Sequence, residues 1–313
     1  MTSTSGVPHL KSAVAAGESP FSLANESVYR RWRERKLKDY PTTIADLRIE
    51  VRDPQRLTDA EVATLLATVA KTNMAIYGSQ TPADKGVIGA VAARVGLQRL
   101  TTNPLADEDG VSSLQVSAEK SGRGYIPYSN KRLLWHTDGY YNPPAETIRA
   151  FILHCASPAA EGGENALLDH EIAYLLLREA DPDYIRALMA PDAMTIPANT
   201  EPGMAAVRPA SIGPVFSLDS RGNLHMRYTA RTRSIEWKQD TATAAAVQFL
   251  EQLLANDTRY VFRYRLAAGE GLICNNVLHN RTEFRDDAQA KRLIYRARYY
   301  DRVADSVTYA AFK

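Results

Sequence analysis

The chain has 313 residues, of which 45% are hydrophobic and 24% charged, so it can bury a large core as one large domain or two small ones. A formal net charge of +2, without a long basic tract interleaved with aromatic residues, argues against a nucleic-acid partner. The sequence has only two cysteines, no signal-peptide pattern and no run of eighteen apolar residues, which predicts a cytoplasmic protein with reduced thiols and no membrane segment.

The first part of the chain predicts a loose arm followed by helices. Residues 1–24 are rich in Ser, Gly, Ala and Pro without periodicity, which is typical of a flexible N-terminal arm. Residues 27–39 alternate aromatic and basic side chains, which predicts a short amphipathic helix whose outer face either contacts a partner subunit or is solvated. Thr58 and Glu61 form a capping box ahead of apolar residues at helical spacing. Further helices are predicted over 83–95, from Asp169 onward, and around 247–254.

Strands dominate the second half of the sequence. Apolar and β-branched runs predict them at 147–155, 225–229, 260–266, 271–278 and 293–300. Helices followed by irregularly spaced strands argue against alternating βαβ units and for a mainly β core with helices, of the α+β class. No repeat or linker divides the chain, so residues 25–313 are predicted to form a single domain in which a strand from the N-terminal half pairs with later ones.

Three potential metal ligands stand out. His136 and Asp138 follow an apolar run, and in extended backbone residues two apart point to the same side, so both can reach one ion. Gly139 would let the chain turn directly afterwards. His279, after the apolar run 271–278, is the natural third ligand. Two imidazoles and one carboxylate are typical of mononuclear ferrous oxygenases, although an isolated pair like His136 and Asp138 serves a hydrogen bond as often as a metal.

The C-terminal strand adds context to these ligands. Its period of two places Arg292, Arg296 and Arg298 on one face. Such a face either points to solvent or lines a polar cavity, where a guanidinium grips a carboxylate by two charge-assisted hydrogen bonds. A dicarboxylate cosubstrate would need this grip.

In combination these motifs resemble the taurine dioxygenase and clavaminate synthase superfamily of Fe(II)/2-oxoglutarate-dependent dioxygenases. The similarity covers about residues 100–300. It is carried by His136-Thr137-Asp138, Gly162-Gly163-Glu164-Asn165, His279 and the strand from Arg292 to Arg296. More loosely, Met226-Arg227-Tyr228 and the pair Asn275-Asn276 resemble the glutarate 2-hydroxylase relatives within that superfamily.

The resemblance implies a double-stranded β-helix, or jelly roll, with a helical N-terminal region and helical insertions. It assigns the distal carboxylate of 2-oxoglutarate to Arg292, and places Arg296 near the iron-bound carboxylate or an acidic group of the substrate. Relatives usually offer Thr to the cosubstrate from the loop after the double glycine. This chain has Asn165 there, whose amide can still donate to a carboxylate.

The implied activity is oxidation, by default hydroxylation, of a small polar molecule such as a carboxylate or an amino acid, with Fe(II), 2-oxoglutarate and O2 and with release of succinate and CO2. Arg298 would engage an anionic substrate. The other candidate pocket residues, which are equally consistent with plain wall packing, are Tyr125, Tyr128, Asn130, Tyr140 and Tyr141.

Two other classes stay open at this stage. One is a non-catalytic jelly-roll binding module, which does not explain why all three ligand types and the arginine strand occur together. The other is a zinc-dependent hydrolase, which leaves the arginine face unexplained. The sequence identifies neither the substrate nor the oligomeric state, and a homo-oligomer remains open.

Overall fold

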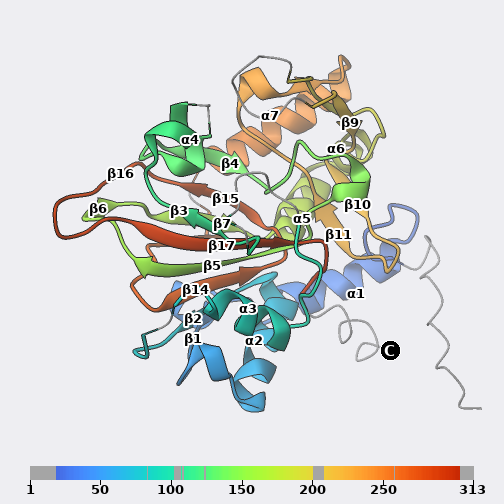
Figure 1. Ribbon diagram of the computed structural model, residues 1–313. Coiled ribbons are helices and arrows are strands. Elements are labelled where there is room, and N and C mark those ends of the chain that lie inside the picture. The colour runs from blue at the N-terminus through green and yellow to red at the C-terminus, as the bar shows by residue number, and fades with distance from the viewer. Residues whose placement is uncertain are drawn as a thin grey trace, which may run out of the picture.

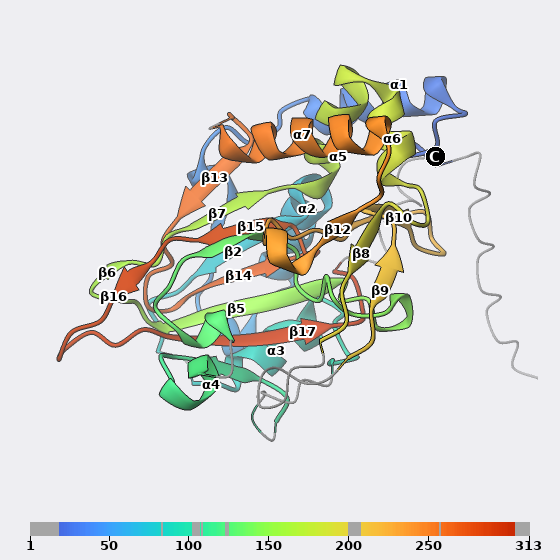
Figure 2. The same cartoon turned by 90° about the horizontal axis from the view of Figure 1, so that it is seen from above.

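The computed structural model describes residues 19–303, apart from residues 83, 102–106, 108, 123–124, 200–207 and 257. In that part of the chain, two β-sheets lie face to face and helices gather on their outer sides (Figure 1). The view from above shows the same layering (Figure 2). The predicted mixture of a β core and helices is confirmed. Among the described residues, no helix combines the length and the apolar character needed to cross a bilayer.

The larger sheet has six strands and carries the arginine strand. Its order is β1 (Arg48–Glu50), β2 (Met74–Gly78), β14 (Glu270–Cys274), β5 (Ala150–Ser157), β17 (Leu293–Tyr299) and β3 (Ser112–Leu114). Only β1 and β2 are parallel, and the other pairs are antiparallel. Strand β2 lies early in the chain and pairs with β14, as expected for a core strand from the N-terminal half.

The second sheet has four strands and carries the two histidines. Its order is β13 (Val261–Tyr264), β7 (Asn165–Leu168), β15 (Leu278–Arg281) and β4 (Leu133–His136). The facing sides of the two sheets share one apolar cluster, to which Phe151 and Ile294 of the larger sheet and Leu167 and Leu278 of the smaller sheet contribute. Three small sheets complete the fold: β12 (Glu236–Trp237), β8 (Met194–Ile196) and β9 (Ser211–Gly213); β10 (Phe216–Leu218) and β11 (Leu224–Met226); and β16 (Phe284–Arg285) and β6 (Glu161–Gly162).

Helices cover the sheets from two sides. α2 (Asp59–Thr72) and α3 (Val87–Arg94) pack on the outer face of the six-stranded sheet through a second apolar cluster that includes Leu65, Val91 and Tyr77. α5 (His170–Ala180), α6 (Pro182–Leu188) and α7 (Thr241–Ala255) contact one another on the side of the four-stranded sheet (Figure 1). The remaining helices are α1 (Glu26–Leu37) and the short α4 (Ala118–Gly122).

Most predicted elements occur, with two informative differences. The capping box is present, since the Thr58 side chain accepts from the Glu61 amide and the Glu61 carboxylate accepts from the Thr58 amide. The helix predicted over 83–95 begins only at Val87. The apolar run 271–278 is not one strand, because Asn276 adopts a left-handed conformation with φ 52° between β14 and β15. At this break the chain passes from the larger sheet to the smaller one.

Residues 1–18 of the predicted arm lie outside the described residues. Residues 19–24 are described, and Phe21 is fully buried with its ring 5.0 Å from that of Trp32 and 5.3 Å from that of Tyr174. The packed part of the chain therefore begins before residue 24. The division into an arm and a single domain stays a prediction.

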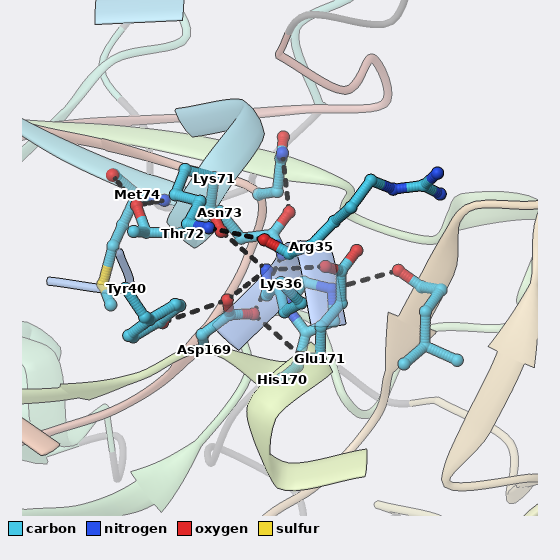
Figure 3. Close-up of polar contacts among 12 residues, drawn as sticks. Arg35, Lys36, Tyr40, Lys71, Thr72, Asn73, Met74, Asp169, His170 and Glu171 are labelled. Atoms are coloured by element: carbon cyan, nitrogen blue, oxygen red, sulfur yellow. Dashed lines mark hydrogen bonds and ion pairs between the residues drawn. The ribbon is translucent and has the colours of Figure 1, made fainter. Parts of the chain in front are cut away.

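A buried ion cluster ties α1 to the core (Figure 3). Nζ of Lys36 lies 2.6 Å from the Asp169 carboxylate and 2.7 Å from the Glu171 carboxylate, and all three side chains are nearly inaccessible to solvent. Asn73 donates to Asp169 at 2.9 Å and accepts from Asn275 at 3.1 Å. The cluster therefore extends to the chain segment between β14 and β15.

Candidate metal and cosubstrate site

Strand β4 brings the first two candidate ligands to the gap between the sheets. The strand ends at His136, and the amide of Thr137 then donates to the Tyr228 carbonyl at 3.0 Å, which holds the chain extended toward Asp138. Gly139 follows with φ 69°, and a Cβ there would lie 2.6 Å from Ile148. A residue without a side chain is required at this turn, as expected.

The third candidate ligand lies opposite the first. His279 of β15 is the register partner of His136, and the two imidazole centroids are 4.2 Å apart. Nε2 of His136 lies 3.7 Å and Nε2 of His279 lies 4.0 Å from the same oxygen of Asp138. One ligand atom from each residue therefore falls within 4.8 Å of the others, and the structure brings together the three residues that the sequence singled out.

The protonation of both imidazoles favours metal binding. Nδ1 of His136 lies 2.8 Å from the Leu134 carbonyl and Nδ1 of His279 lies 2.9 Å from the Val277 carbonyl, so each Nδ1–H is the donor and each Nε2 presents a lone pair. Burial, together with the neighbouring His279, lowers the pKa of His136 to about 3. Burial also lowers the pKa of His279. Both rings are therefore neutral at pH 7.

The carboxylate of Asp138 is ionised. Burial by itself would raise its pKa, but the positive charges of Arg296 and Arg298 outweigh burial and hold the pKa well below its usual range. Nη1 of Arg296 donates to Asp138 at 3.2 Å. Two neutral imidazoles and one carboxylate are the donor set expected for Fe(II) with open coordination positions, so these residues fit the ion.

The residues beside this triad fit a dicarboxylate. Arg292 and Asn165 line one cavity together with Cys155, Gly163 and Ile294. Within the described structure, the buried Nη1 of Arg292 and Nε of Arg296 have no hydrogen-bond partner. Leaving such donors unpaired costs about 1–3 kcal/mol each, more when charged, so the site favours an anionic ligand that satisfies them.

The alternation predicted for the C-terminal strand is observed at Arg296 and Arg298, whereas Arg292 precedes β17 and the strand register shifts between Leu293 and Ile294. Arg296 points to Asp138 and Arg298 to Tyr141, whereas Ala297 and Tyr299 join the apolar cluster under α2 and α3.

The candidate substrate residues fall into different surroundings. Arg298 donates to the Tyr141 hydroxyl at 3.3 Å. Tyr128 is buried, and Nζ of Lys120 lies 4.6 Å from its ring centroid. Tyr140 packs against Tyr141 with centroids 5.2 Å apart, and Tyr125 packs against the main apolar cluster. Asn130 is exposed, and its backbone carbonyl accepts from the Phe284 amide.

Asn276 also belongs to the site, although the sequence indicated it only through the family resemblance. Asn276 is buried, and its amide hydrogen-bonds the backbone of Asp138 and the Ile148 carbonyl. The signal available in the sequence was an Asn within an apolar run ahead of His279, since Asn tolerates the left-handed conformation that ends a strand.

Comparison with known proteins identifies the family. Residues 35–298 match the family described as "Taurine catabolism dioxygenase TauD, TfdA family". The chain therefore belongs to the TauD/TfdA family. The predicted resemblance is confirmed, and with it, at the level of the family, the enzyme class of Fe(II)/2-oxoglutarate-dependent oxygenases and their cofactors.

Curated relatives match part of the chain. A uridine-5'-phosphate dioxygenase from Amycolatopsis sp. is 34% identical over 172 residues, which are 53% of this chain and 60% of the relative. A protein of the same name from Streptomyces sp. is 33% identical over 171 residues, 52% of this chain and 60% of the relative. The chain thus spans about three fifths of the length of these relatives.

Solved structures show the same fold at low identity. An asparagine oxygenase with Fe(II), 3-hydroxyasparagine and succinate has a TM-score of 0.54 and 15% identity, and the match covers 77% of this chain and 81% of the other. A taurine dioxygenase from Burkholderia xenovorans has a TM-score of 0.54 and 19% identity, covering 83% and 87%. The oxygenase OrfP, with Fe, succinate and dihydroxyarginine, has a TM-score of 0.58 and 15% identity, covering 79% and 82%.

Proposed function

We propose that this chain is an Fe(II)/2-oxoglutarate-dependent dioxygenase that hydroxylates a small polar, anionic molecule and releases succinate and CO2. The observation that carries the proposal is the convergence of His136, Asp138 and His279 between the sheets, together with two arginines that each have a buried nitrogen without a partner among the described residues. A binding module would not need this combination, and a zinc hydrolase would not use the arginines.

Each residue of the site has a role in this proposal. His136, Asp138 and His279 hold the iron, and Arg292 and Asn165 bind the distal carboxylate of 2-oxoglutarate. Arg296 holds Asp138 through its 3.2 Å hydrogen bond and directs its free Nε toward the cosubstrate or substrate. When bound, Fe(II) and 2-oxoglutarate would supply the electrons that activate O2, which is the oxidant. The protein positions the reactants and excludes water from the site.

We also infer that the two main sheets are the halves of a double-stranded β-helix, and that residues 25–313 form one domain. The shared apolar cluster and the passage of the chain from β14 to β15 support this inference.

The substrate is expected to carry an acidic group. Arg298 supports this, because it is nearly buried and has a tyrosine hydroxyl as its hydrogen-bond partner among the described residues. Small carboxylic acids and amino acids are therefore candidates. Uridine 5'-phosphate joins them because it is named in the curated relatives.

Succinate release tests the activity. The Fe(II)-loaded protein is incubated aerobically with 2-oxoglutarate and each candidate substrate, and succinate and substrate are quantified. The proposal expects succinate in stoichiometric ratio to an oxidised product with at least one anionic compound, and loss of both in His136→Ala. Zinc-dependent cleavage of a candidate substrate without 2-oxoglutarate would contradict it.

A further inference from the structure

Three arginines contact Tyr140 or Tyr141, in the chain segment after Asp138. Among the described residues, Arg208, Arg227 and Arg298 form no ion pair with a carboxylate, whereas Arg296 pairs with Asp138. Arg227 is fixed by backbone carbonyls, since it donates to those of Tyr140 and Ser211 at 2.6 Å each. Its positive charge therefore stays uncompensated beside this segment.

Tyr141 connects the other two guanidiniums. Nη1 of Arg298 lies 3.3 Å from its hydroxyl, and the Arg208 guanidinium lies over its ring, 5.5 Å from the centroid. Tyr141 therefore contacts both cations, Arg298 through its hydroxyl and Arg208 through the face of its ring. Arg208 is further oriented by a 3.0 Å hydrogen bond from its Nη1 to the Pro197 carbonyl.

This group of cations lies beside the metal site but apart from the cosubstrate cavity. Arg298 pairs in register with Phe151, whose ring lies 4.9 Å from that of His279. Arg292, at the other end of β17, lines the cavity with Asn165. Along this strand, Arg296, which contacts Asp138, lies between Arg292 and Arg298.

We propose that Arg298, Arg208 and the Tyr141 hydroxyl form a subsite for a phosphate monoester group of the substrate. This inference rests on the proposed function and specifies its substrate class. A phosphate monoester carries a charge of about −1.5 to −2 at pH 7 and has three acceptor oxygens. The charge of a phosphate monoester can neutralise two guanidiniums, whereas the charge of a carboxylate neutralises only one. Its three oxygens can accept hydrogen bonds from both guanidiniums and from the tyrosine hydroxyl.

Calorimetric titration with inorganic phosphate tests the subsite without requiring the substrate. The anaerobic protein is first saturated with Fe(II) and 2-oxoglutarate, so that the metal site and Arg292 are occupied. Phosphate and acetate are then titrated at equal ionic strength into the wild type, Arg298→Gln, Arg208→Gln and Arg31→Gln. Arg31 is an exposed residue of α1, so its variant controls for the loss of one positive charge.

We expect phosphate to bind wild type and Arg31→Gln equally, at least about tenfold more tightly than acetate, and to lose about tenfold or more in each of the other two variants. Equal affinity for phosphate and acetate, or unchanged phosphate affinity in Arg298→Gln and Arg208→Gln, would overturn the subsite. A second titration uses the protein without Fe(II) and 2-oxoglutarate. If it binds phosphate as expected but forms no complex with Fe(II) and 2-oxoglutarate when they are added, the proposed function fails and the anion site stands.

Discussion

The side chain of Asn276 holds both backbone groups of Asp138. Its Oδ1 accepts from the Asp138 amide at 2.7 Å, and its Nδ2 donates to the Asp138 carbonyl at 2.9 Å and to the Ile148 carbonyl at 2.7 Å. Asn276 is 1% exposed and sits at the break between β14 and β15. A residue in the segment that leads into the strand of His279 therefore fixes the backbone position of the candidate ligand Asp138.

Asn276→Gly should weaken iron binding about 10–100-fold, the usual cost of losing a residue that orients a ligand. Glycine keeps the left-handed backbone without strain, so the change removes only the amide. Fe(II) affinity is measured anaerobically by competition with a chelator.

The neighbouring Asn275 provides the matched control. It contacts Asn73 and the Val303 amide instead of Asp138. Asn275→Ala should lower the unfolding free energy but leave iron affinity unchanged. Equal iron affinity in both variants would refute the orienting role of Asn276.

Arg292→Lys should raise the KM for 2-oxoglutarate about 10–100-fold with unchanged iron affinity, because an ammonium cannot form the two parallel hydrogen bonds of a guanidinium. Arg285→Lys, at an exposed ion pair with Glu161, is the control and should behave as wild type. An unchanged KM in Arg292→Lys and also in Arg292→Ala would reassign the distal carboxylate to Arg296.

Lys36→Met should destabilise the fold by about 3–5 kcal/mol, since it leaves Asp169 buried without its cation and Glu171 with only Arg302, at 3.7 Å. Arg30→Met removes the exposed pair with Glu26 on the same helix and should cost at most about 0.5 kcal/mol. Urea unfolding of both variants measures the difference. Similar free energies for the two variants would show that the buried cluster contributes no more than a surface pair.

Acid should destabilise the protein through its buried histidines. Burial lowers the pKa of His154 to about 4, below the ordinary value of 6.5. The imidazole therefore binds a proton more tightly in the unfolded chain than in the folded protein. The stabilising contribution is fully present above about pH 6.5 and is lost as the pH falls toward about 4. Between about pH 7.5 and pH 5, unfolding free energy should drop by on the order of 1–2 kcal/mol more in wild type than in His154→Gln. The same drop in both would contradict this assignment.

The sequence was informative where the signal is local. The spacing of His136 and Asp138, the capping box at Thr58 and the alternating faces of β17 are set by backbone geometry, and the structure shows each of them. The strand break at Asn276 was missed because an apolar run does not reveal a change of sheet.

The gathering of Arg208 with Arg298 was missed for a different reason. Periodicity assigns a residue to a face of its own strand but does not say which distant segment lies opposite. Arg208 and Tyr141 belong to segments far apart in sequence. The fold brings the Arg208 guanidinium over the Tyr141 ring.

The central claim is that His136, Asp138 and His279 hold an iron that also binds 2-oxoglutarate. Anaerobic addition of Fe(II) and then 2-oxoglutarate to the intact protein tests it most directly. We predict a weak visible charge-transfer absorption that appears only with both additions and is lost in His279→Ala. No absorption in the intact protein, or the same absorption in His279→Ala, would contradict the claim.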